Sequence, residues 1–232
     1  RRIGTQFISE VKSSAAKTRL IPFEFSTTQT YVLEFGNTYI RFYKDKGQIV
    51  SGGSAYEISS PYLTAELFDI KFAQSADVMY ITHPNHEVMK LSRTGHTSWT
   101  LAQVDSTDGP YLATNSTTTT LTPAQAATGS NINITASAVT GINSGAGFQT
   151  TDVGRIISFN GGKAKITART NTTVVVCTIT TAFTNTNATA GFNLGAFSDT
   201  TGHPSCVSFF EQRLVFAGTK DEPQTLFFSK AG

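Results

Sequence analysis

The sequence predicts an all-β protein, a partial β-propeller of blade-like meanders that carries an inserted small β-barrel or β-sandwich. Three observations lead to this prediction. Short runs of β-branched and aromatic residues alternate with turn residues along most of the chain. Helical periodicity is weak, with residues 9–17 and 64–68 as the best short candidates. The strand-rich pattern recurs at a spacing of roughly 40 to 50 residues, which is typical of propeller blades.

The first meander lies between residues 20 and 50. Residues 20–25, 30–35 and 38–43 are predicted strands, because they are rich in the β-branched and aromatic residues that favour a pleated sheet. Gly36 and Asn37 separate the second run from the third and predict a hairpin turn. A turn at residues 44–47 and a short run after it complete the meander.

The same layout returns twice along the chain. Predicted strands of the second meander are residues 69–72, 78–82, 88–92 and 99–101, and those of the third are residues 206–210, 213–217 and 224–229. A blade cannot bury both of its faces alone, so such meanders are expected to stack. Three meanders are too few for a closed propeller, so we expect a piece of a longer protein or closure with a partner. A β-sandwich of similar hairpins is the structural alternative.

Residues 112–197 differ in composition, because they are rich in Thr and poor in charge. They still contain predicted strands, at residues 131–136, 155–159, 163–168 and 172–179, with a hairpin turn at Asn160-Gly161-Gly162. Thr suits strands because its branched Cβ fits a half-buried pleated surface. We therefore predict N-terminal propeller blades over residues 1–111, an inserted Thr-rich β domain over 112–197, and a returning blade over 198–232.

The composition and motifs exclude several classes of protein. The 232 residues carry a net charge of +2, and 39% of them are hydrophobic, which is too apolar for a disordered chain. No apolar run approaches the roughly 20 residues of a membrane span. The chain contains no G-x-S-x-G, H-E-x-x-H or phosphate-binding glycine loop. We therefore expect a protein that is not an enzyme, with no catalytic residue, metal or cofactor.

Some isolated residues allow a chemical interpretation and a structural one. His83 and His86 flank Pro84-Asn85 and could be a metal pair, but a polar hairpin turn is favoured, because Pro84 prevents a helix from aligning the rings. The acidic pairs Asp105 with Asp108 and Asp221 with Glu222 are interpreted as solvated turn residues. The two cysteines, Cys177 and Cys206, are predicted to be small buried thiols.

Basic residues near the start of the chain are the candidate functional residues. A surface that faces DNA uses such residues to neutralise phosphates. The alternative is an ordinary solvated surface, and it is favoured because acidic residues lie among the basic ones. The candidate DNA-channel or interface residues are Arg1, Arg2, Lys12, Lys17, Arg19, Arg41, Lys44 and Lys46.

Several strings carry a resemblance to a known family. They are residues 19–26 (RLIPFEFS), 31–37 (YVLEFGN), 39–43 (YIRFY), 77–84 (DVMYITHP), 91–93 (LSR), 95–99 (GHTSW), 213–218 (RLVFAG) and 223–224 (PQ). Together they resemble the N-terminal region of bacteriophage tail nozzle proteins, also called tail tubular protein B or packaged-DNA stabilisation proteins of short-tailed phages. The resemblance covers about residues 1–111 and 197–232. Ile3 departs from the family's pattern, which has Pro there.

The resemblance implies a structural virion protein of the phage tail. Such a protein assembles in the host cytoplasm as a ring homo-oligomer below the portal and adaptor proteins. The ring retains and then passes the genome, contacts DNA transiently, binds tail fibre proteins and has no membrane span. The alternative function is a carbohydrate-binding or depolymerising propeller protein of a phage tail spike, with a cleft lined by Trp99, tyrosines and carboxylates.

Overall fold

The computed structural model describes residue 4, residues 6–26 and residues 29–230, and it confirms an all-β protein. The helical content of the described residues consists of two short 3₁₀ turns, η1 (Asn143–Gly145) and η2 (Thr150–Asp152). The chain forms two compact units. Unit 1 contains Arg1–Val104, Pro204–Gly218 and Gln224–Gly232, and unit 2 contains Asp105–His203 and Thr219–Pro223.

The first sheet of unit 1 is an antiparallel meander of β1 (Arg19–Glu24), β2 (Thr30–Gly36), β3 (Tyr39–Lys44) and β4 (Gly47–Gln48). β7 (Glu57–Ser59) also pairs with β3, after a small hairpin of β5 (Val50–Ser51) and β6 (Ser54–Ala55). The predicted hairpin between the second and third runs is confirmed, with Thr38 at a φ of 63° in its turn. Gly36 is required there, because the Tyr39 ring occupies the place of any Cβ.

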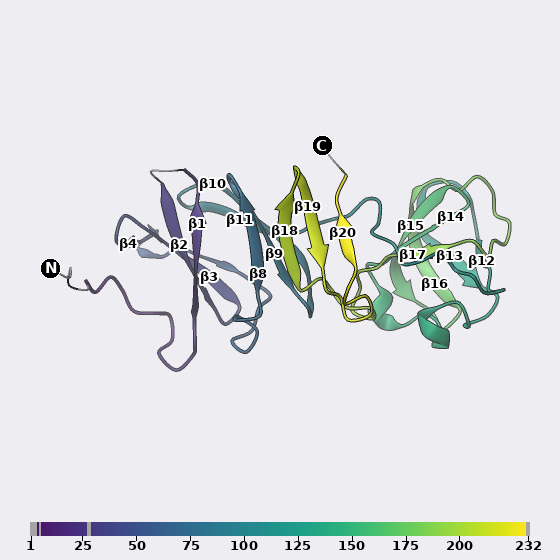
Figure 1. The fold of residues 1–232 in the computed structure, drawn as a ribbon, viewed down its shortest axis with the longest axis horizontal. Helices are drawn as coiled ribbons and strands as arrows, with labels where there is room; N and C mark the ends of the chain where they lie inside the picture. Colours follow the sequence, from purple (N-terminus) through teal and green to yellow (C-terminus); the bar gives the residue numbers. More distant parts are fainter. Residues whose placement is uncertain (1–3, 5, 27–28, 231–232) are drawn as a thin grey trace. The chain divides into compact units, whose positions relative to one another are not determined.

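The second and third sheets of unit 1 are also antiparallel. The second has the order β11-β10-β9-β8, from β8 (Lys71–Ser75), β9 (Val78–His83), β10 (His86–Gly95) and β11 (Ser98–Gln103). The third is β18 (Cys206–Phe210), β19 (Arg213–Ala217) and β20 (Leu226–Phe228), drawn in yellow-green and yellow in Figure 1. β18 contacts β8 and β9, where the Tyr80 and Phe209 rings lie 6.0 Å apart.

The first and second sheets share one core. Phe23, Tyr31 and Phe42 from the first sheet surround Trp99 from the second, with ring centroids 4.8, 5.2 and 4.4 Å away. Tyr62 from the loop before β8 is buried in the same core. The alternation of apolar residues along each strand places these side chains on the faces that meet. Aromatic packing therefore joins the two meanders.

Unit 2 is built on a curled, half-barrel sheet with the order β12-β13-β16-β15-β14-β17. Its strands are β12 (Leu121–Pro123), β13 (Gly129–Ala136), β14 (Ile156–Phe159), β15 (Gly162–Arg169), β16 (Val174–Thr181) and β17 (Asn193–Leu194). The concave side of this sheet is apolar, because side chains alternate between the two faces of each strand. In β16, for example, Val175, Cys177 and Ile179 are buried in the core of unit 2. Thr189, just before β17, bridges to Leu121 at the opposite edge. The predicted turn at Asn160-Gly161 is confirmed, with both residues at positive φ.

A buried ion pair in unit 2 links two segments of the chain next to the sheet. Arg155 and Asp152 are fully buried, and Arg155 Nη1 lies 3.0 Å from Asp152 Oδ1. Arg155 also donates to Asn143 Oδ1 at 2.7 Å and, through Nε, to the Gly195 carbonyl at 2.6 Å. Asp152 Oδ2 accepts hydrogen bonds from Asn143 Nδ2 and from the Gln149 backbone, both at 2.7 Å. The pair thus fastens the loop before β14 to the segment after β17.

The best helical candidates of the sequence, residues 9–17 and 64–68, form turns and irregular chain, in agreement with their weak helical periodicity. The sequence also predicts a turn over residues 74–77, but the turn is shorter, because β8 continues to Ser75 and Ala76 adopts a φ of 48°. Cys177 is buried as expected, but Cys206 is exposed on β18.

The two thiols are expected to differ sharply in reactivity. Burial raises the pKa of Cys177 to about 12, and the thiolate is the reactive form. In the native protein, Ellman's reagent should therefore modify Cys206 rapidly and Cys177 only after unfolding. The measurement is the number of fast-reacting thiols, and the Cys206→Ser variant should have none. Two fast-reacting thiols in the native protein would contradict the burial of Cys177.

Candidate functional site

Two histidines face each other at the end of the β9–β10 hairpin. His83 is the last residue of β9 and His86 the first of β10, and they are directly paired across the two-residue turn. Opposite residues of an antiparallel pair project on the same side of a sheet. The two imidazole centroids consequently lie 5.1 Å apart.

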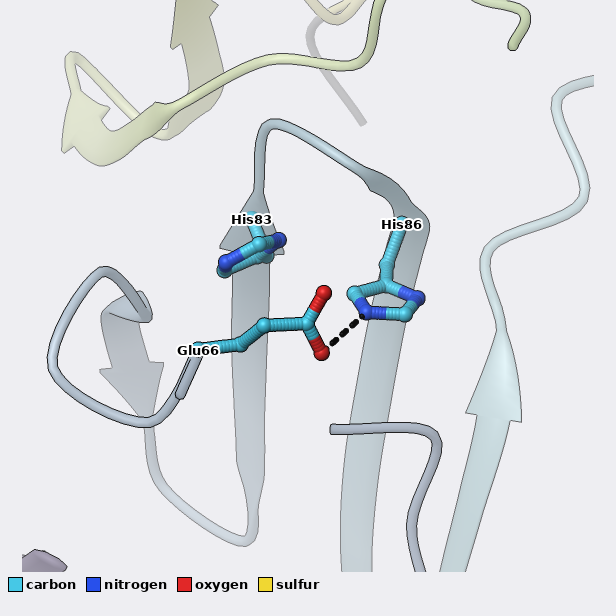
Figure 2. Close-up of side chains that lie close together, drawn as sticks. All are labelled: Glu66, His83 and His86. Carbon is cyan, nitrogen blue, oxygen red and sulfur yellow. Dashed lines mark hydrogen bonds and ion pairs between the residues drawn. The ribbon is translucent and has the colours of Figure 1, made fainter. Parts of the chain in front are cut away.

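Glu66 completes this group from the loop between β7 and β8. Its Oε2 lies 2.9 Å from His86 Nε2 and accepts a hydrogen bond of 2.8 Å from the Leu63 backbone N–H. Figure 2 shows the Glu66 carboxylate between the two rings, with its dashed contact to His86. One ligand atom from each of Glu66, His83 and His86 lies within 4.8 Å of the other two. We call these three residues the Glu-His-His corner.

Two buried polar atoms at this corner have no hydrogen-bond partner among the residues that the structure describes. His83 is 1% exposed, and its Nε2 is without a partner in the structure, as is the hydroxyl of Tyr62. The Tyr62 ring lies 5.2 Å from the His86 ring and 6.1 Å from the His83 ring, between centroids. Buried polar groups are normally paired, so each unpaired atom marks a place where a ligand or water would be stabilised.

The electrostatics of the corner favour a neutral His83 imidazole and an ionised Glu66 carboxylate. Burial lowers the pKa of His83 below its ordinary value, although the Glu66 carboxylate opposes this effect. Burial alone would raise the pKa of Glu66, but the Leu63 N–H and His86 outweigh it, so this pKa lies below its ordinary value. The group therefore offers the donor set of two imidazoles and one carboxylate that binds zinc in proteins.

The sequence showed only part of this group. The predicted turn between His83 and His86 is present, and strand pairing aligns the two rings where Pro84 prevents a helix. Glu66 was missed, because nothing in its local sequence connects it to the histidines. His83 and His86 at the two ends of a short turn are the signal that could have prompted a search for a third ligand.

The structure separates the predicted basic residues into small groups. Arg1 and Arg2 lie outside the described residues. Lys12 and Arg41 meet at Glu57, with distances of 2.5 and 2.9 Å from their nitrogens to its carboxylate oxygens. Burial would raise the pKa of Glu57, but the hydrogen bonds from Lys12 and Arg41 outweigh it and lower the pKa. These two cations are thus partly neutralised by one acid.

The other basic residues have different surroundings. Arg19 donates to the carbonyls of Leu67 and Ile70 at 2.8 and 2.7 Å, which anchors the loop before β8. Lys17 is exposed. Lys44 pairs with Asp45 at 3.3 Å. Lys44 and Lys46 also line a groove of about 400 Å³ on unit 1, whose apolar lining is Ile8, Val11, Leu20 and Val32.

The acidic pairs considered from the sequence also have defined positions. Asp105 pairs with Lys165 at 2.9 Å and Asp108 with Lys163 at 2.8 Å, so both hold the chain entering unit 2 against β15. Asp221 is exposed. Asp105 and Asp108 are therefore surface acids that form ion pairs with β15.

No protein-family model matches the chain, and no curated protein matches it. Within the described part of the chain, no helix is both long and apolar enough to cross a membrane.

Proposed function

We propose that this chain is part of a structural virion protein of a phage tail nozzle. It forms a ring homo-oligomer in the channel that retains and releases the genome. The ring lies below the portal and adaptor and carries tail fibre proteins. In this proposal the three larger sheets of unit 1 are blades of a partial propeller, and unit 2 is an inserted β domain. The chain belongs to the virion and is assembled in the host cytoplasm.

The shared core of the first two sheets is the observation that carries this proposal. Two antiparallel meanders about 40 residues apart bury their aromatic faces against each other, as stacked blades do. The third meander contacts the second through β18. Such stacking makes a stiff scaffold, which is the mechanical property that a channel wall needs. The strings that resemble nozzle proteins lie mainly in these same meanders.

The position of Trp99 disfavours the carbohydrate alternative. Sugar sites stack an aromatic face against the ligand, and that face must be exposed. Trp99 is only 6% exposed, and Phe42 is stacked on it with a centroid distance of 4.4 Å. Its indole N–H donates to the His96 carbonyl at 3.1 Å. Trp99 is therefore a core residue and does not provide a sugar platform.

Immunogold electron microscopy of the virions that carry this chain tests the proposal. An antibody raised against the purified chain should label the tail below the portal. Disrupted virions should release the labelled protein as a ring of several copies, measured by native mass spectrometry. Label on the capsid shell alone, or release as a monomer that cleaves the host polysaccharide, would contradict the nozzle proposal.

A further inference from the structure

We propose that the Glu-His-His corner of unit 1 binds a divalent transition metal, with Zn²⁺ as the best fit. Glu66, His83 and His86 are the three protein ligands. The site fastens the loop before β8 to the β9–β10 hairpin. This inference is independent of the nozzle proposal, because it depends only on the geometry of these three side chains.

The ligand chemistry selects the class of metal. Imidazole nitrogens suit zinc and its first-row neighbours, whereas Ca²⁺ and Mg²⁺ prefer all-oxygen sites. Zinc sites with two His and one Glu leave a fourth position for water. Ligand atoms around a tetrahedral zinc lie roughly 3.3 to 3.5 Å apart, given bond lengths of about 2.0–2.1 Å. The three atoms here lie within 4.8 Å, so small side-chain rotations would bring them to that spacing.

The burial of the three ligands allows that adjustment. The side chains of His86 and Glu66 are 23% and 17% exposed, which leaves them a route for a hydrated ion. His83 is almost fully buried and held in place by the packing of β9. His83 can therefore stay in place while the side chains of His86 and Glu66 rotate to coordinate the metal. Nε2 of His83 has no hydrogen-bond partner among the described residues, and coordination of a metal by this nitrogen would give it one.

Metal binding must change the positions of the histidine ring protons and the hydrogen bonds of the two rings. The Asn85 backbone N–H donates to His83 Nδ1 at 3.1 Å, so the neutral ring carries its proton on Nε2. Coordination through Nε2 moves the ring proton to Nδ1 and gives up the Asn85 hydrogen bond. Coordination through Nδ1 replaces that hydrogen bond with the metal and leaves Nε2 protonated. Either geometry also replaces the direct contact between His86 and Glu66 with two bonds to the metal. The proton that His86 Nε2 donates to the Glu66 carboxylate then moves to Nδ1 of the same ring.

Calorimetric titration of the chelator-treated 232-residue chain with ZnCl₂ tests the site. We expect one Zn²⁺ per chain with a micromolar or tighter Kd, and no comparable binding of Mg²⁺. The thermal midpoint followed by Trp99 fluorescence should rise with Zn²⁺ concentration, because the ion binds only the folded form. Trp99 lies in the core of the same unit and therefore reports on it.

Matched variants separate this site from adventitious binding. His86→Ala and Glu66→Gln should each weaken Zn²⁺ binding by roughly tenfold or more, since the loss of an outer-sphere partner alone has an effect of that size. Both residues are partly exposed, so these variants should fold without the metal. His96→Ala removes an exposed histidine of the same unit and should leave the affinity unchanged. Absence of saturable Zn²⁺ binding, or equal affinity in all three variants, would overturn the proposal.

Discussion

Replacing Arg155 with Met is expected to lower the free energy of unfolding of unit 2 by about 3–5 kcal/mol. The substitution leaves the Asp152 carboxylate buried without its cationic partner. It also removes the hydrogen bonds from Arg155 to Asn143 and Gly195. A buried, unpaired charge is among the few defects that cost this much.

The thiol of Cys177 provides the measurement for this variant. Cys177 lies in the core of unit 2 and becomes reactive when that unit unfolds. In a Cys206→Ser background it is the only thiol, so its modification at increasing urea concentrations measures the stability of unit 2. The Arg155→Met variant should be modified at much lower urea than its parent.

Two further variants make the interpretation specific. Lys163→Met removes the surface partner of Asp108 in the same unit and should cost less than about 1 kcal/mol. Adding Asp152→Asn to Arg155→Met should restore part of the lost stability, because the orphaned carboxylate becomes neutral. A loss for Arg155→Met no larger than that for Lys163→Met would show that the buried pair contributes little.

Replacing Phe42 with Ala is expected to destabilise unit 1 by about 3–5 kcal/mol. Phe42 is fully buried, and its ring is stacked on Trp99 and tilted against Tyr56, with centroids 4.4 and 5.4 Å away. Truncation removes these contacts and leaves a cavity between the first and second sheets, which the flanking strands can fill only in part. Stability lost here measures the packing that joins the two meanders.

Trp99 fluorescence in a denaturant series is the measurement for Phe42→Ala. Trp99 is the chain's single tryptophan and touches the cavity directly. Val50→Ala is the control, because Val50 on β5 is 58% exposed, and its change should stay within about 0.5 kcal/mol. If both variants unfold at the same midpoint as the parent, the shared core does not hold unit 1 together.

The longer strands and tight turns could be predicted from the sequence. The β-branched run over residues 172–179 predicted a strand, and β16 lies there, with Val175, Cys177 and Ile179 buried. Asn160-Gly161 predicted a hairpin turn, because few other residues adopt positive φ at low cost. Some strands of two residues, such as β6 and β17, escaped prediction because they contain too few residues to show a period.

The candidate site and the grouping of charges were decided by the tertiary structure. Glu66 reaches the two histidines only because the loop before β8 packs against the β9–β10 hairpin. Arg41 lies opposite Glu57 because β7 pairs with β3, and Lys12 reaches the same carboxylate from the segment before β1. Strand and turn preferences depend on neighbouring residues, which the sequence displays directly. Contacts between distant segments depend on which apolar faces pack together, and this packing has no local sequence signal.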